Sequence, residues 1–286
     1  MNKKAGLYDE ELRYDNMGNI ETLRRWNGRT DSLSNNFKYT YSGPRLSSVT
    51  DGGIAKRTNS FTYDVNRNAI TNKRFGITKI EYNYLNLPVT FIKGTDTLVY
   101  KSDALGQKLT KELGSATTHY VDGTQYKNGA IEFIQTEERR ILPSNDSYIY
   151  QYFLQDHLGN TRAVVDHSGT IKQIQDYYPF GLEMNQGNAL NTASNLYKYN
   201  GKEKQVEMGL NQLDYGARFY DAEIGRWNVV DPLAEQMQIY SPYVYGNNNP
   251  IRFIDPDGRK GVDWIKWKAN TGTTYYTYDP DVKNID

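Results

Sequence analysis

The segment Ile80-Glu81-Tyr82-Asn83-Tyr84 alternates apolar and polar residues, and Phe37-Lys38-Tyr39-Thr40-Tyr41 does the same. Successive side chains of a β-strand point to opposite faces, so this period of two predicts strands with an inward and an outward face. Around these segments the chain is rich in tyrosine, with 25 tyrosines against 9 phenylalanines and 4 tryptophans. Tyrosine suits half-buried strand positions, because its ring packs while its hydroxyl stays in water. The sequence therefore predicts a mainly β fold.

A turn pattern recurs between the alternating segments. An Asp is followed three residues later by Gly and then by Asn, Gln or Thr. An Asp at the first position of a tight turn accepts backbone N–H groups, and a Gly tolerates the positive φ that closes the turn. The copies are Tyr14-Asp15-Asn16-Met17-Gly18-Asn19, Asp103-Ala104-Leu105-Gly106-Gln107, Asp156-His157-Leu158-Gly159-Asn160 and Asp166-His167-Ser168-Gly169-Thr170.

The turns recur at a nearly constant interval. The spacings are 19, 20 and 19 residues between Asp64, Asn83, Asp103 and Asp122. A unit of about 20 residues accommodates two short strands with their turns, so the first half is predicted to be a ribbon of hairpins in series. The alternative is an ordinary antiparallel β domain whose turns resemble one another. Helices are predicted only at Glu203 to Leu213, as a short helix, and at Pro232 to Met237, as one turn.

Composition and charge exclude several kinds of site. The 34 basic and 34 acidic residues balance, so no global field favours nucleic acid or an anionic membrane. Without cysteine the fold has neither disulfides nor thiolate metal sites. The three histidines are far apart and show no ligand spacing, so neither a metal nor a cofactor is predicted. They are His119, His157 and His167.

No targeting or membrane-spanning segment is evident in the sequence. The N-terminus begins basic but reaches Asp9 and Glu10 before any apolar run, unlike a classical signal peptide. No apolar stretch approaches the length needed to span a membrane. Export would therefore use a route without a cleaved N-terminal signal. The turn pattern is already under way near the first residues, which favours a truncated or split product of a longer gene.

The segment from Asp176 to Arg259 carries a series of specific motifs. They are Asp176-Tyr177-Tyr178-Pro179-Phe180-Gly181, Tyr199-Asn200-Gly201-Lys202-Glu203, Leu213-Asp214-Tyr215-Gly216-Ala217-Arg218-Phe219-Tyr220-Asp221, Gly225-Arg226-Trp227, Asp231-Pro232-Leu233-Ala234, Ser241-Pro242-Tyr243-Val244-Tyr245-Gly246-Asn247-Asn248-Asn249-Pro250 and Asp255-Pro256-Asp257-Gly258. In this order they resemble the Rhs-associated core domain, in the form common among Bacteroidetes. The upstream turns resemble the YD repeats of Rhs proteins and of the C components of Toxin Complex assemblies.

The resemblance implies a fold and a division of the chain. A YD-repeat β-hairpin ribbon over residues 1–175 would form a curved, open shell, a partial cocoon. A core domain over residues 176–259 would fold inward at its C-terminal end. Residues 260–286 would be the variable tail, where relatives place a toxin. This tail is predicted to form one hairpin with Asn270-Thr271-Gly272 at its turn, and its 27 residues are too few for an independent enzyme domain.

The resemblance also implies a function. The chain would be the shell or carrier fragment of a secreted polymorphic-toxin system, enclosing a C-terminal effector in competition between bacteria. Its partners would be an upstream Rhs shell protein or secretion machinery, the C-terminal toxin and an immunity protein. It would be cytoplasmic before export and then secreted or held at the cell surface. The alternatives are a cell-surface carbohydrate-binding module, whose tyrosine-rich sheet stacks on sugars, and a non-functional orphan core cassette.

Relatives with this core domain act as intramolecular aspartyl proteases, and the matching residues here are Asp231 and Asp255. Two close carboxylates can share one proton, so that one acts as an acid while the other activates water. They are 24 residues apart, so only a fold-back of the intervening chain would pair them. Arg226 matches the Gly-Arg-aromatic motif and would steady a carboxylate or form a structural ion pair. An Asx-turn role before proline is the alternative for both aspartates.

The expected cleavage site follows Gly258, between Arg259 and Lys260. Relatives that cleave carry Leu or Met after this glycine, so Arg259 departs from the pattern. A long cation is expected to fit poorly where an apolar side chain lies beside the two aspartates.

Overall fold

The computed structural model describes residues 8–28, 33–136, 139–145, 147–184, 195–236, 239–259, 261–268 and 274–278. At residue 139 and from residue 262 on, it describes the backbone alone. In this part of the chain the regular structure is β-strand and short 3-10 turns, without an α-helix. The predicted mainly β fold is therefore confirmed. No helix of the described residues is long and apolar enough to cross a membrane.

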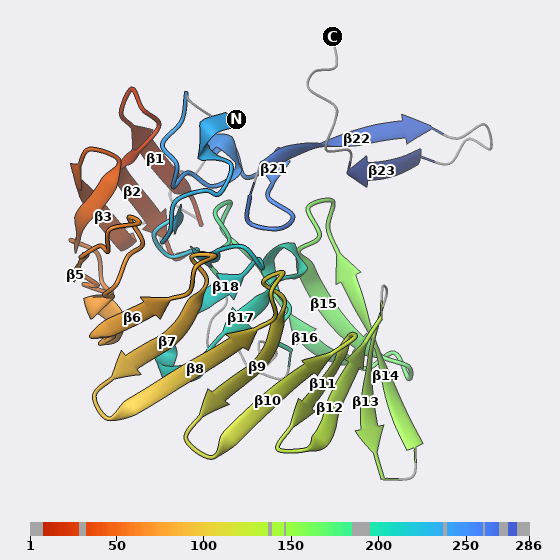
Figure 1. Ribbon diagram of the computed structural model, residues 1–286. Coiled ribbons are helices and arrows are strands. Elements are labelled where there is room, and N and C mark those ends of the chain that lie inside the picture. Colours follow the sequence, from red (N-terminus) through yellow and green to blue (C-terminus); the bar gives the residue numbers. More distant parts are fainter. Residues whose placement is uncertain are drawn as a thin grey trace.

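Two sheets hold the first sixteen strands, and in both each strand pairs antiparallel with its neighbour in sequence. The five-stranded sheet consists of β1 (Glu10–Tyr14), β2 (Ile20–Trp26), β3 (Leu33–Ser42), β4 (Arg45–Asp51) and β5 (Asn59–Ser60). The eleven-stranded sheet consists of β6 (Lys79–Tyr82), β7 (Pro88–Lys93), β8 (Asp96–Ser102), β9 (Lys108–Leu113), β10 (Ala116–Val121), β11 (Thr124–Lys127), β12 (Ala130–Gln135), β13 (Arg139–Ser144), β14 (Ser147–Gln155), β15 (Thr161–Asp166) and β16 (Ile171–Ile174). Together these sheets form a curved wall (Figure 1).

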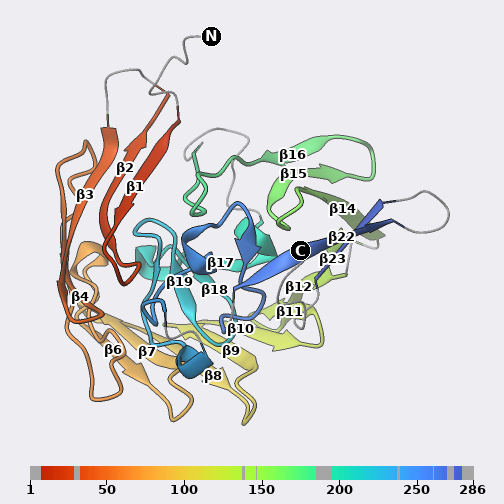
Figure 2. The ribbon, with the colours of Figure 1, turned by 90° about the horizontal axis from the view of Figure 1, so that it is seen from above.

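The remaining strands form two further sheets. One sheet is built from β17 (Glu203–Gln205), β18 (Gln212–Asp214), β19 (Phe219–Asp221) and β20 (Arg226–Trp227), and another from β21 (Phe253–Ile254), β22 (Val262–Lys268) and β23 (Thr274–Tyr278). The 3-10 turns are η1 (Lys73–Phe75), η2 (Tyr199–Gly201), η3 (Glu207–Gly209), η4 (Ala234–Gln236) and η5 (Gly246–Asn248). We refer to residues 195–236 and 239–259 as the central segment, because the wall curves around it (Figure 2).

The recurring Asp and Asn residues close the turns of the wall. In these turns, apart from the one at Asp122, the side-chain Oδ1 accepts the backbone N–H four residues later, at 2.8 Å from Asn19 to Asp15 and from Gln107 to Asp103. Asp122 instead lies with Gly123 in the two-residue turn between Val121 and Thr124. Neighbouring turns also touch, since Asn68 Nδ2 donates to Asn86 Oδ1 at 2.8 Å. The spacing of about 20 residues therefore places successive turns side by side on one edge of the ribbon. At Gly106 the backbone φ of 88° requires a residue without Cβ.

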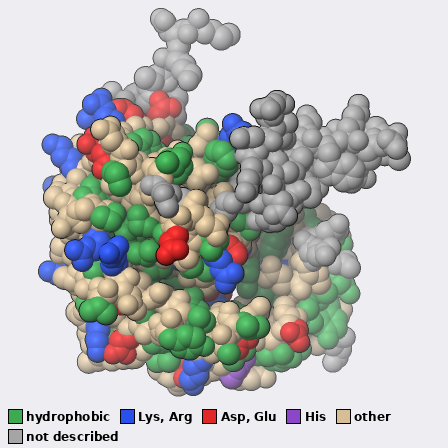
Figure 3. Space-filling view, turned by 45° about the horizontal axis from the view of Figure 1, so that its top comes forward, with side chains coloured by type: hydrophobic (Ala, Val, Ile, Leu, Met, Phe, Trp, Pro, Cys, Tyr) green, Lys and Arg blue, Asp and Glu red, His purple; other side chains and the backbone are tan. Residues whose placement is uncertain are grey.

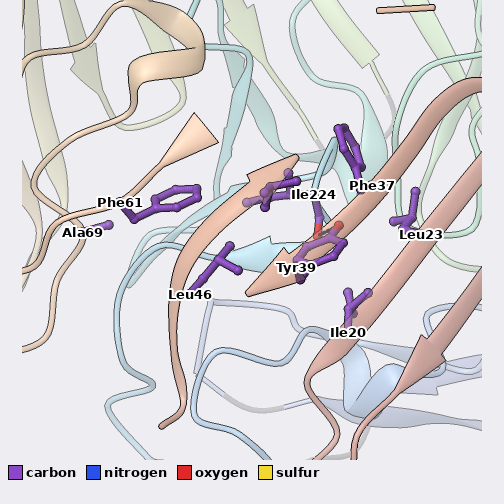
Figure 4. Packing of buried hydrophobic residues seen from close by; sticks show 9 residues of the cluster. Ile20, Leu23, Phe37, Tyr39, Leu46, Phe61, Ala69 and Ile224 are labelled. Carbon is purple, nitrogen blue, oxygen red and sulfur yellow. Dashed lines mark hydrogen bonds between the residues drawn. The ribbon is translucent and has the colours of Figure 1, made fainter. Parts of the chain in front are cut away.

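The hydrophobic core lies where the wall meets the central segment. Ile224 packs among residues of β2 and β3 that include Leu23 and Phe37 (Figure 4). Farther along the wall, Phe91 and Tyr100 contact Phe219 with ring centroids 6.1 and 5.5 Å apart. A third cluster is internal to the C-terminal half and stacks Tyr177, Tyr199, Tyr215, Tyr220, Trp227 and Tyr245. Outside the core, basic and acidic side chains are interspersed on the face shown in Figure 3.

Buried ion pairs also connect the wall with the central segment. Lys108 of β9 contacts Glu203 at 2.5 Å and Asp214 at 2.6 Å, and Lys111 contacts Glu203 at 3.2 Å. In η1, between the two sheets of the wall, Arg74 pairs with Asp221, and both side chains are buried. Cations of the wall thus neutralise carboxylates of the central segment, which would be costly to bury without a partner.

The short helix predicted over Glu203 to Leu213 is wrong. Its two ends are the strands β17 and β18, which pair with each other, and η3 lies between them. Glu203 and Gln205 both face the wall, which is the alternation of a strand. Met208 and Asn211 have φ of 54° and 51°, and such left-handed residues end a helix.

The other two local predictions have separate outcomes. The single turn predicted at Pro232 to Met237 is confirmed as η4, although Met237 lies outside the described residues. In the tail, β22 and β23 pair antiparallel from Trp264↔Tyr278 to Lys268↔Thr274, while the expected turn residues 270–272 lie outside the described residues. The proposed boundaries at residues 175 and 259 stay a prediction.

The Lys108–Glu203 contact predicts a specific acid sensitivity. Burial raises the pKa of Glu203, but Lys108 and Lys111 outweigh it and lower that pKa to about 2. An unfolded glutamate titrates near 4.3, so this contribution is present above that pH and is lost as the pH falls toward 2. We expect the difference in free energy of unfolding between the wild type and Glu203→Gln, measured with urea, to shrink by on the order of 3 kcal/mol between pH 5 and pH 2. The exposed Glu235→Gln serves as control, and an equal pH dependence in both variants would contradict the prediction.

Candidate functional site

The centre of the site is Arg218, which a tight turn between β18 and β19 holds in place. Tyr215 N–H donates to the Arg218 carbonyl at 3.1 Å, and Gly216 N–H donates to Asp214 Oδ1 at 2.9 Å. The Arg218 guanidinium lies over the Trp227 ring, 4.2 Å from its centroid. Its side chain is only 1% exposed. A buried guanidinium has to find acceptors for its donors, and here the acceptors define the site.

Asp231 and Asp255 converge on this guanidinium. Arg218 Nη2 donates to Asp231 Oδ2 at 2.7 Å and to Asp255 Oδ2 at 3.1 Å. Both aspartates are almost fully buried, with 3% and 1% of their surface exposed. The fold-back of the chain between residues 231 and 255 therefore brings the two carboxylates to one cation.

The backbone around Gly258 belongs to the same cluster. Arg218 Nε donates to the Gly258 carbonyl at 2.5 Å, and Asp255 Oδ1 accepts the N–H groups of Gly258 and Arg259 at 2.7 and 2.9 Å. Gly258 has φ of 79°, and a Cβ there would lie 2.9 Å from the backbone nitrogen of Arg218. Only glycine fits this position without displacing the arginine.

Both aspartates also cap turns, as the alternative interpretation expects. Asp255 Oδ1 closes the turn at Gly258, and Asp231 Oδ1 accepts the N–H of Leu233 at 2.7 Å. Each carboxylate thus uses one oxygen for the local turn and the other for Arg218. The turn and the ion pair with Arg218 therefore coexist, because they use different oxygens.

Burial sets the charge state of the cluster. Burial raises the pKa of Asp231 and of Asp255, and the nearby Arg218 opposes the rise in each. For Arg218, burial lowers the pKa and the two carboxylates oppose that change. Two carboxylates against one guanidinium leave an excess negative charge, so one carboxyl takes up a proton more readily than an exposed aspartate. An acid next to a base is the arrangement that peptide hydrolysis by carboxylates requires.

Arg226 does not contact Asp231 or Asp255. Its guanidinium lies over the rings of Tyr41 and Tyr243, at 5.1 and 4.6 Å from their centroids, and donates to the Pro44 carbonyl. The arginine that contacts Asp231 is Arg218, 13 residues before it, which the sequence reasoning missed. The available signal was the position of Arg218 inside the motif that begins at Leu213.

The remaining predicted residues are placed as follows. Arg259 is half-exposed, with its Nη1 3.7 Å from Asp257 Oδ2, and Lys260 lies outside the described residues. Among the described residues, no group of three or more His, Cys, Asp or Glu could hold a metal ion.

Comparisons with known proteins identify relatives but no family model matches the chain. It is 28% identical over 255 residues to salivary gland surface protein 1 of Aedes aegypti, covering 80% of this chain and 7% of that protein. It is 26% identical over 287 residues to the tRNA3(Ser)-specific nuclease WapA of Bacillus spizizenii, covering 93% of this chain and 11% of that protein. Over 103 residues it is 35% identical to toxin subunit YenC2 of Yersinia entomophaga, and the match covers 35% of this chain and 10% of that protein. The homologues thus include Tc toxin components and WapA nucleases, which are Rhs/YD-repeat proteins.

Solved structures show that the fold is shared. A chain of the TcdB2-TccC3-TEV crystal structure matches with a TM-score of 0.58 and 19% identity, covering 88% of this chain and 17% of that one. A chain of the Photorhabdus luminescens Tc holotoxin pore matches with a TM-score of 0.57 and 17% identity, covering 94% of this chain and 17% of that one. The chain spans about a tenth of the length of the curated relatives named above and about a sixth of these solved chains.

Removing Arg218 should destabilise the protein, because Asp231 and Asp255 would lose the cation that they share. Arg218→Met leaves Asp231 and Asp255 buried without their cation, and we expect it to lower the free energy of unfolding by about 3–5 kcal/mol. The triple variant with Asp231→Asn and Asp255→Asn should recover part of this loss, because no uncompensated charge remains. Chemical denaturation at pH 7 measures both, with the exposed Arg13→Met as control. A loss in Arg218→Met that the two added substitutions do not reduce at all would contradict this account.

Proposed function

We propose that the chain is a shell fragment of an Rhs/YD-repeat toxin protein, and that it carries an effector segment linked after residue 259. The observation that carries the proposal is the position of the central segment inside the curved wall, with Asp231, Asp255 and Gly258 in one buried cluster. The toxin subunits and nucleases among its homologues support a toxin-related shell. In this proposal residues 1–175 are the shell, 176–259 a core domain of the Bacteroidetes form, and 260–286 the variable tail.

The wider role follows from the same proposal. An upstream Rhs shell protein would supply the rest of the wall, and secretion machinery would export the assembly without a classical signal peptide. The effector would act in competition between bacteria, and an immunity protein would protect the producer.

Self-cleavage is the chemical part of the proposal. One carboxylate of the pair Asp231 and Asp255 takes a proton from water, whose oxygen bonds to the carbonyl carbon of Arg259. The other carboxyl gives its proton to the nitrogen of Lys260 as the C–N bond breaks, which leaves a new carboxyl at residue 259 and a new amine at residue 260. Arg218 positions both carboxylates and the adjoining Gly258 carbonyl. The raised pKa values of the two aspartates support an acid and a base in this pair.

A second candidate function rests on the outer face of β14. Tyr148, Tyr150 and Tyr152 alternate along this strand and are 51%, 36% and 37% exposed. Alternate residues of a strand share one face at intervals of about 7 Å. Such a row of rings, with Pro143 and Ile141 opposite two of them, presents flat apolar surfaces edged by hydroxyls. Tyrosine rings of this kind stack on sugars, so the face is a candidate for carbohydrate binding.

The intact mass of the purified protein tests self-cleavage. We expect a fragment that ends at residue 259, and we expect Asp231→Asn and Asp255→Asn each to abolish it, because one carboxyl alone cannot act as both acid and base. The exposed Asp257→Asn, two residues away from Asp255, is the matched control and should cleave. One full-length mass for the wild type at every pH from 4 to 8 would end the self-cleavage proposal.

A glycan array tests the second candidate. If the β14 face binds sugars, the double variant Tyr148→Ala/Tyr152→Ala should lose signal by tenfold or more. Tyr84→Ala removes a more exposed ring, at a turn away from this face, and should leave the signal unchanged. An array without any signal for the wild type would remove the carbohydrate-binding candidate.

A further inference from the structure

Three consecutive backbone carbonyls precede residue 259, and a different donor of the central segment holds each of them. The donor and acceptor pairs are Lys202 Nζ to the Pro256 carbonyl, the Ala217 N–H to the Asp257 carbonyl, and Arg218 Nε to the Gly258 carbonyl. The next carbonyl in the chain is that of Arg259, which the proposed reaction attacks. A peptide fixed at the three preceding carbonyls has little freedom to turn the next one away from the aspartates.

Lys202 is the one of these donors whose presence the rest of the fold does not explain. It lies between η2 and β17, in a loop that its own backbone closes. The Lys198 N–H donates to the Lys202 carbonyl at 3.0 Å, and the Lys202 N–H donates to the Tyr199 carbonyl at 3.0 Å. The loop therefore does not require a lysine side chain, and the bond to Pro256 is what the ammonium adds.

Two aromatic rings fix Lys202 relative to Arg218. Lys202 Nζ lies 5.2 Å from the centroid of the Tyr215 ring, and this ring lies 5.0 Å from the Trp227 ring. The Arg218 guanidinium in turn lies 4.2 Å from the centroid of Trp227. Both rings are buried, so neither can shift without disturbing the core. The stack thus sets the separation of the two cations that hold the segment from residue 256 to residue 258.

The ammonium also acts on the charge of the aspartate cluster. Burial lowers the pKa of Lys202, and Asp214, Asp255 and Asp257 oppose this change. Asp255 is therefore within electrostatic range of a second cation in addition to Arg218. A nearby cation favours the ionised form of a carboxyl group, which is the form that activates water.

We propose that Lys202 is a positioning residue for self-cleavage, because its ammonium holds the Pro256 carbonyl and thereby aligns the bond after Arg259 with the two aspartates. The inference rests on the proposed self-cleavage for its effect on rate, but not for the hold on the backbone. An arginine at position 202 can still donate to this carbonyl. A methionine keeps a long side chain over Tyr215 but has no donor.

Cleavage rates test the effect of the hold. Lys202→Met should slow release of the fragment ending at residue 259 by roughly tenfold to a hundredfold, because a charge-assisted hydrogen bond is lost. Lys202→Arg should restore most of the rate. Lys101→Met, which removes an exposed lysine of β8, is the matched control and should cleave like the wild type.

The pH profile separates positioning from a purely structural effect. Without the Lys202 ammonium the pKa of Asp255 rises, so cleavage by Lys202→Met should fail at a higher pH on the acid side than cleavage by the wild type. Equal rates in Lys202→Met and the wild type would overturn the proposal and leave self-cleavage intact. A slow Lys202→Met with an unchanged pH profile and no rescue by Lys202→Arg would also overturn it.

Amide hydrogen exchange tests the hold without any cleavage. In an Asp231→Asn background, chosen to keep the chain uncleaved, Lys202→Met should speed exchange of the Gly258 and Arg259 N–H groups about tenfold. Both groups form their hydrogen bonds in the segment that Lys202 holds. The N–H of Gln107, which closes a turn of the wall, should exchange at the same rate in both proteins.

The two measurements together distinguish the role of Lys202 from self-cleavage itself. Faster exchange at Gly258 and Arg259 without cleavage in any variant would retain the hold and reject self-cleavage. Unchanged exchange together with unchanged cleavage rates would reject the role of Lys202 alone. Should Lys202→Met not fold, Lys202→Gln, which is uncharged and shorter than lysine, takes its place with the same expected direction.

Discussion

The structure depends on the burial of charge between the wall and the central segment. Glu203, Asp214 and Asp221 leave water only because Lys108, Lys111 and Arg74 of the wall meet them. The same contacts leave each part incomplete by itself, since separation would expose apolar rings and strip these three carboxylates of their cations. The wall and the central segment are therefore one cooperative unit, and the curvature of the wall is tied to the segment inside it.

The candidate site also buries carboxylates against a cation, but within the central segment itself. There the cation is Arg218, and the carboxylates are Asp231 and Asp255. As at Arg74, which contacts both Asp221 and Glu223, two acids share one guanidinium. The backbone at Gly258 takes another of its donors. The cluster therefore holds one particular peptide segment beside a pair of acids that carries an unneutralised charge.

Much of the fold can be predicted from local sequence, because strands and turns are local. The alternation that begins at Ile80 places β6, which ends at Tyr82, and the recurring Asp residues place turns of the wall. Prediction failed at Glu203 to Leu213, where helix-forming residues such as Glu and Leu lie in strands β17 and β18. The contacts that decide this segment come from Lys108 and Lys111, about 95 residues earlier in the chain. Such distant partners leave no periodic signal, and the same holds for Arg218, whose role depends on a fold-back rather than on spacing.

The contacts between neighbouring turns have a further consequence for how such walls diversify. Asn68 meets Asn86 and Tyr84 meets Ala104, so neighbouring units contact each other through their turns as well as through their strands. In a structure built from nearest-neighbour contacts, a whole unit can be duplicated or deleted and its neighbours can rejoin. Duplication in steps of about 20 codons would preserve these turn-to-turn contacts, and only the strands that face the central segment would have to keep their contacts with it.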